Sequence, residues 1–198
     1  RVEVRPNAGL AGGSVKPLSI AMKSLDDPSK SDSVTATTTT NNYSVDTLVG
    51  ITTTAYNTTS AAQSTDNDAG QAVTYYIKID NTGDMANTIT VTGTAGDSNW
   101  TVSYYDAPSG ATDITAQVVL GTYQPTAIPA AGNKEIRVEV RPSVNVSGTA
   151  QKALVIEAKS ITLPNPADAI AATTTVSTRY KVDSQIAKSS ELPGYTGN

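Results

Sequence analysis

The chain has 198 residues and a formal net charge of −4, and it contains no Cys, no His and no Phe. Without Cys and His it has no disulfides, no thiolate nucleophile and no imidazole base or ligand, which excludes most familiar catalytic sites and argues for a protein without a cofactor that is not an enzyme. The acidic balance disfavours nucleic-acid binding, and no apolar run approaches the roughly 20 residues that cross a bilayer.

The first six residues, Arg1–Pro6, recur as Arg137–Pro142. The alignment continues from residues 1–40 onto residues 137–176, and a one-residue slip then brings Tyr43 onto Tyr180. The matched pairs include Lys16 with Lys152, Leu18 with Leu154, Ile20 with Ile156, and Asp32 with Asp168. A period of about 136 to 137 residues predicts tandem structural units.

This period divides the chain into three parts. Residues 1–40 are expected to be the C-terminal strands of a preceding repeat, residues 41–176 one complete repeat, and residues 177–198 the first strand of a following repeat. The chain opens without Met or a signal peptide, so we expect a mature fragment. Incomplete sheets have unpaired edges, so strands shared with a neighbour are expected at Val2, Val4, Leu18, Ile20 and Val182.

Within the complete repeat, apolar residues alternate with polar ones, which is the pattern of half-buried strands. The alternating sets are Val73, Tyr75, Ile77 and Ile79; Ile89 and Val91; Trp100, Val102 and Tyr104; and Ile136, Val138 and Val140. A weaker set runs through Val45, Thr47, Val49 and Ile51. No segment shows convincing helical periodicity.

Turn-forming residues separate these strands at 80–83, 107–110 and 129–133. Short strands at this spacing predict an all-β fold, a two-sheet sandwich with Greek-key connections. The order of motifs, with Asn81-Thr82-Gly83 after a strand, then Trp100, then a Pro129-to-Gly132 turn before an alternating strand, resembles the NEW3-like and related Ig-like repeats of bacterial and archaeal surface proteins. The resemblance implies immunoglobulin-like repeats that act as extracellular spacers, scaffolds or binding modules, and it implies no catalytic residues.

An acidic loop carries Asp66, Asn67 and Asp68. Oxygen-rich loops of this kind hold Ca²⁺ in many proteins, which makes these three residues a candidate calcium site. The spacing lacks the later bidentate Glu of an EF-hand, and a simply solvated turn is the alternative interpretation.

Four sequons place candidate glycosylation sites at Asn42, Asn57, Asn99 and Asn145, although sequons also arise by chance in a chain rich in Asn and Thr. Aromatic residues such as Trp100 could stack on a sugar if several rings faced solvent together. Strand alternation places Trp100, Tyr75 and Tyr104 inward, which favours core packing.

The leading functional hypothesis is a structural subunit, or a fragment, of an extracellular filament, pilus-like fibre or surface layer. Its repeats would be joined covalently or by strand complementation, so that its partners are copies of itself or adjacent repeats of the same chain. The alternative is a carbohydrate-binding or adhesin module of a secreted multidomain protein. Both hypotheses place the protein outside the cell or on its surface.

Overall fold

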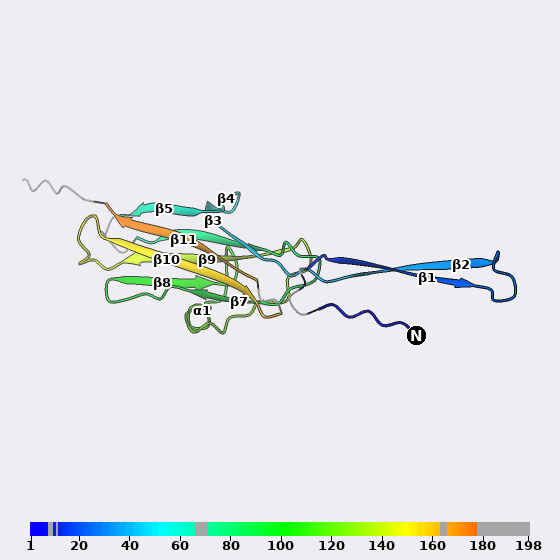
Figure 1. The fold of residues 1–198 in the computed structure, drawn as a ribbon. Coiled ribbons are helices and arrows are strands. Elements are labelled where there is room, and N and C mark those ends of the chain that lie inside the picture. The colour runs from blue at the N-terminus through cyan, green and yellow to red at the C-terminus, as the bar shows by residue number, and fades with distance from the viewer. Residues whose placement is uncertain (8–9, 11, 66–70, 163–165, 178–198) are drawn as a thin grey trace, which may run out of the picture.

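A computed structural model describes residues 1–7, 10, 12–65, 71–162 and 166–177. Figure 1 shows a β-sandwich with a long two-stranded hairpin that projects from one of its ends. The hairpin is formed by β1 (Val15–Lys23) and β2 (Ser31–Thr39). Among the described residues, no helix is long and apolar enough to span a membrane.

One sheet of the sandwich has the strand order β4-β3-β6-β9-β8. The strands are β3 (Asp46–Thr52), β4 (Ala55–Asn57), β6 (Val73–Asp80), β8 (Trp100–Tyr105) and β9 (Asn133–Pro142). Their pairs are all antiparallel.

The second sheet has the order β5-β11-β10-β7. It contains β5 (Ser60–Thr65), β7 (Ile89–Gly93), β10 (Gln151–Ser160) and β11 (Ala167–Val176). The pair β5–β11 is parallel, and the other two pairs are antiparallel. The order β3-β6-β9-β8 against β7-β10-β11 reproduces the ABED and CFG sheets of an immunoglobulin domain. The predicted all-β, immunoglobulin-like fold is therefore confirmed.

The inward residues of both sheets form one core, as the period-two pattern predicts. Tyr75, Ile77, Tyr104, Ile136 and Leu154 are among its fully buried side chains. The hydroxyl of Tyr104 donates to the carbonyl oxygen of Thr94 over 2.9 Å, and that of Tyr75 donates to the carbonyl oxygen of Thr173 over 2.7 Å. The core therefore also satisfies the hydroxyl groups of these two buried tyrosines.

Two details differ from the sequence-based expectation. Ile51, placed on the buried face of its strand, is 55% exposed, because the pairing of β3 with β4 shifts register between Val49 and Thr52. A short helix, α1 (Thr115–Leu120), lies between β8 and β9 and buries Val118. Six residues make fewer than two turns, which is too little to establish a helical period in a sequence.

Candidate assembly surface

The projecting hairpin β1–β2 has the same strand register as β10–β11, shifted by the repeat period. Val15 pairs with Thr39, as Gln151 pairs with Thr175, and the correspondence holds through Lys23 with Ser31 and Lys159 with Ala167. The open ends of the two hairpins, opposite their turns, also match. The amide of Gly13 donates to the carbonyl oxygen of Thr40, and that of Thr149 donates to the carbonyl oxygen of Val176, both over 2.8 Å. The sequence repeat is thus a repeat of local structure.

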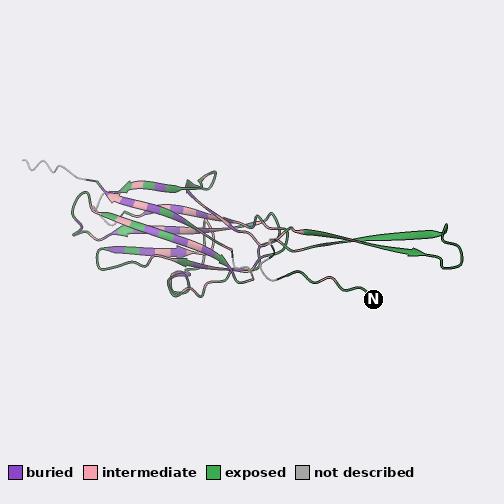
Figure 2. Ribbon diagram, viewed as in Figure 1, coloured by how far each residue is buried: buried purple, intermediate pink, exposed green. Residues whose placement is uncertain are grey.

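The surroundings of the two hairpins differ completely (Figure 2). In the sandwich, β10 pairs with β7 and β11 pairs with β5, and the inner face packs against the opposite sheet. The sheet of β1 and β2 has two strands only. The described hairpin therefore has two free edges and a bare face.

The bare face carries the apolar residues whose counterparts form the core. Leu154, Ile156 and Ile170 are at most 2% exposed, whereas their counterparts Ile20 and Val34 are 37% and 59% exposed and Leu18 is half-buried. Met22, the counterpart of the buried Ala158, is 66% exposed. An isolated two-stranded hairpin is only marginally stable in water, so covering this face would stabilise the hairpin.

Two charged residues of the hairpin also lack the contacts of their counterparts. Lys152 forms a 2.7 Å ion pair with Asp97 in the β7–β8 loop, and Lys16 has no ion pair among the described residues. The carboxylate of Asp168 accepts a 2.7 Å hydrogen bond from the amide of Thr47 in β3. Within the described residues, its counterpart Asp32 accepts only from the adjacent amide of Ser33. The hairpin therefore presents polar groups that match a β3-like strand and a β7–β8-like loop.

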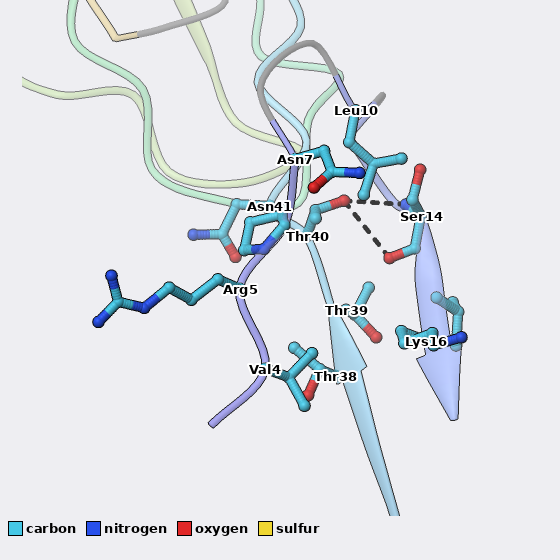
Figure 3. A pocket seen from close by; sticks show the side chains of 12 residues that line it. Val4, Arg5, Asn7, Leu10, Ser14, Lys16, Thr38, Thr39, Thr40 and Asn41 are labelled. Carbon is cyan, nitrogen blue, oxygen red and sulfur yellow. Dashed lines mark hydrogen bonds between the residues drawn. The ribbon is translucent and has the colours of Figure 1, made fainter. Parts of the chain in front are cut away.

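A groove of about 610 Å³ lies at the base of the hairpin (Figure 3). Its lining includes Val4, Leu10 and Thr38. In the sandwich the counterpart of Thr38 is the buried Thr174, whose hydroxyl lies 3.0 Å from the hydroxyl of Tyr75. The groove thus lies beside a position where the complete sandwich holds an aromatic side chain.

The residues predicted for shared strands have different outcomes. Leu18 and Ile20 lie on the bare face of β1. Val2 and Val4 belong to no strand, because their counterparts Val138 and Val140 form ladders with β6 and β8 that the N-terminal segment lacks. Val182 lies outside the described residues.

The other predicted sites are scattered. Asp66, Asn67 and Asp68 lie outside the described residues, so the calcium hypothesis stays a prediction. Within the described part of the chain, no three acidic side chains gather as metal ligands would. The sequon residues Asn57, Asn99 and Asn145 are exposed and Asn42 is half-buried, which leaves their glycosylation a prediction as well.

The aromatic rings that could have stacked on a sugar lie in the core, as alternation predicts. Tyr75 and Tyr104 are fully buried and Trp100 is 5% exposed. Burial raises the pKa of both tyrosines. The half-buried Tyr105 is covered by the guanidinium group of Arg137, 4.3 Å from the ring centre. The other described tyrosines are half-buried, so every described aromatic ring is at least partly covered by the fold.

No protein-family model and no curated protein matches the chain. Among solved structures, it is similar to a family 123 glycoside hydrolase from Clostridium perfringens, with 12% identity and a TM-score of 0.45 over 67% of this chain and 27% of that one. It is also similar to PapD-like domain 7 of human CEP192, with 6% identity and a TM-score of 0.38 over 68% and 87% of the two chains. A third similar structure is AggA, the major subunit of aggregative adherence fimbriae type I from Escherichia coli, with 12% identity and a TM-score of 0.36 over 71% and 97%. The chain spans only about a quarter of the glycoside hydrolase.

Proposed function

We propose that this chain is a structural, non-enzymatic part of an extracellular filament or surface assembly, built from immunoglobulin-like repeats that follow one another end to end. The observation that carries the proposal is the hairpin β1–β2. It has the same strand register as β10–β11, but it lacks the strands that neighbour β10–β11 in the sandwich. Residues 1–40 are then the end of one repeat, and residues 41–176 are the next repeat. The hairpin and residues 1–6, the counterpart of the end of β9, are completed by strands equivalent to β3, β5, β6, β7 and β8, on the same polypeptide or on another copy.

The geometry of the chain suits such an array. The hairpin projects from one end of the sandwich, and β11 ends at the opposite end (Figure 1). Repeats connected through these ends form a rod rather than a cluster. The covered hairpin would bury Leu18, Ile20, Met22 and Val34, and each such side chain contributes roughly 1.5–3 kcal/mol when it is fully removed from water. Cohesion between repeats therefore comes from a shared core.

The proposal is tested by charge substitutions on the two faces of β1. Ile20 faces the side that is buried in the sandwich, and its neighbour Ala21 faces the other side, as Glu157 does in β10. The full chain should self-associate as its concentration rises, because copies cover one another's bare hairpins. In analytical ultracentrifugation, Ile20→Asp should abolish this association and Ala21→Asp should leave it intact.

Both positions are exposed in the isolated hairpin, so unequal effects require a partner on one face only. Equal effects of the two variants would contradict the proposal. So would a chain that stays monomeric at every concentration while its hairpin is fully ordered.

A further inference from the structure

The loop that follows β6 holds the segment that links the hairpin to the sandwich. The linker is residues 41–44, and we call residues 81–84 the socket. The amide of Asn42 donates to the carboxylate of Asp84 over 2.7 Å, and the amide of Asp84 donates back to the carbonyl oxygen of Asn42 over 3.0 Å. The hydroxyl of Thr82 donates to that of Ser44 over 2.8 Å. Reciprocal bonds of this kind fix both the position and the direction of the linker.

Two glycines enclose the linker from opposite elements. A Cβ atom on Gly83 would overlap the carbonyl oxygen of Asn42, and one on Gly12, at the base of the hairpin, would lie 2.6 Å from the Cα atom of Asn42. Real Cβ atoms do not approach other atoms this closely, so either substitution must displace the linker. The backbone of Asn42 is therefore packed between the hairpin and the sandwich.

The socket is itself rigid, because Asn81 anchors it to the core. The side chain of Asn81 is 2% exposed, and its amide nitrogen lies within hydrogen-bond distance of the carbonyl oxygens of Met85, Ile128 and Pro129. Its side-chain oxygen accepts from the amide of Gly83 over 3.1 Å. A buried amide with this many partners holds one loop conformation.

Little freedom remains between the hairpin and the socket. The hairpin's last ladder bonds are at Thr40, and the socket's first is at Asn42, so only Asn41 separates them. A connection this short cannot behave as a flexible chain. Gly148, the counterpart of Gly12, is exposed near the start of β10.

We infer that residues 81–84 are the socket of an inter-repeat joint, which receives the linker of the preceding repeat and sets a fixed angle between successive repeats. The inference rests on the proposed function, since a joint is needed only where repeats follow one another. Its occupant is the linker of this same chain, residues 41–44. An array with this joint is a stiff rod, whereas repeats on free linkers would form a flexible string.

Amide hydrogen exchange of the full chain, measured by NMR, directly tests whether the socket holds the linker. The amide of Asn42 should be protected from exchange. Asp84→Ala should lower its protection factor by about ten-fold or more, because a charge-assisted hydrogen bond usually stabilises the closed state by that factor. The matched control is Asp97→Ala, which removes another loop carboxylate that accepts a backbone amide, from Asn99. It should leave Asn42 unchanged. Random-coil exchange of Asn42 in the parent chain, or an equal loss in both variants, overturns the joint.

The fixed angle is tested with spin labels, because a chain without Cys allows labelling at chosen sites. Val15→Cys at the base of the hairpin and Leu120→Cys on the sandwich are 60% and 75% exposed positions. The distance distribution between the labels should be narrow in the parent and in Asp97→Ala, and broad in Asp84→Ala and Gly83→Ala. Equal widths throughout overturn the inference.

The two proposals fail separately. A chain in which the amide of Asn42 is protected but which never self-associates refutes hairpin completion, and the joint between linker and socket remains supported. A chain that associates through Ile20 while Asn42 exchanges freely keeps the assembly and removes the joint.

Discussion

Two hairpins of almost the same sequence pattern and the same register lie in opposite environments. In β10–β11 the inward side chains are buried under a second sheet, and in β1–β2 the side chains at the same positions are half-buried or exposed. The local pattern therefore determines strand pairing and register, but not burial. Burial requires neighbouring strands, which β10–β11 have in β5, β7 and the opposite sheet and which the described β1–β2 lack.

Under the proposed function, the pairs of matched residues indicate the chemistry of the neighbour that would cover the hairpin. Leu18 matches the buried Leu154, Lys16 matches the ion-paired Lys152, and Asp32 matches Asp168, which is bonded to β3. An apolar partner without charge would satisfy only the first of these. A repeat of the same kind satisfies all three.

The largest expected difference between the two hairpins is in the response to a lost leucine. Leu154→Ala should lower the free energy of unfolding of the sandwich by about 2–5 kcal/mol, because it empties part of a closed core. Leu18→Ala should change it by less than about 0.5 kcal/mol in dilute solution, because its side chain touches no closed core there. Urea unfolding of both variants measures this, and similar losses would show that the hairpin already belongs to the fold of the single chain.

A smaller effect is expected where the two hairpins have different residues in the same backbone conformation. Thr149 has φ of 72° and its counterpart Gly13 has φ of 75°, in the left-handed region where a side chain is strained. Thr149→Gly should therefore raise the free energy of unfolding of the sandwich by about 0.5–1 kcal/mol. The substitution relieves backbone strain in the folded state, and the greater conformational entropy of glycine in the unfolded chain offsets part of that gain.

The control is the nearby exposed Ser147, which has no positive φ. Ser147→Gly relieves no strain, so thermal unfolding should show no gain in stability. Stabilisation by both glycines, or by neither, would contradict this account of Thr149.

The smallest effect concerns the ion pair that only one hairpin possesses. The hydrogen bond from Lys152, followed by the backbone amide of Asn99, holds the pKa of the Asp97 carboxyl below its ordinary value. A depressed folded-state pKa favours the fold above the unfolded pKa, and this contribution is lost as pH falls through the folded pKa.

NMR titration of the Asp97 carboxyl carbon measures this shift. Lys152→Met should raise the pKa of Asp97 toward its ordinary value, and the matched Lys16→Met should leave it unchanged. A shift of Asp97 in the Lys16→Met variant would mean that the hairpin lies elsewhere in solution.

The fold was predictable because alternation identifies strands and their inward faces. Tyr75, Trp100 and Ile136 all lie inside, as expected. The bulge that exposes Ile51 was not predictable, because it depends on pairing with β4. The bare hairpin was predictable from the sequence repeat, because the match of Arg1–Pro6 with Arg137–Pro142 aligns residues 15–39 with the strands β10 and β11.

The socket was not predictable in the same way. The sequence marks Asn81, Thr82 and Gly83 only as a turn, and Asp84 as a polar residue after it. Their role depends on a linker that lies about forty residues earlier in the chain and meets them only in three dimensions. A turn motif reveals its own backbone shape but not what docks on it.

Hydrogen exchange of residues 15–39, measured by mass spectrometry across a range of concentrations, tests hairpin completion most directly. The account predicts fast exchange in the dilute monomer and protection comparable to that of β10–β11 in the assembled state, with Ile20→Asp removing the protection and Ala21→Asp retaining it. Strong protection of the hairpin at the highest dilution, equal in the parent chain and in both variants, would contradict it.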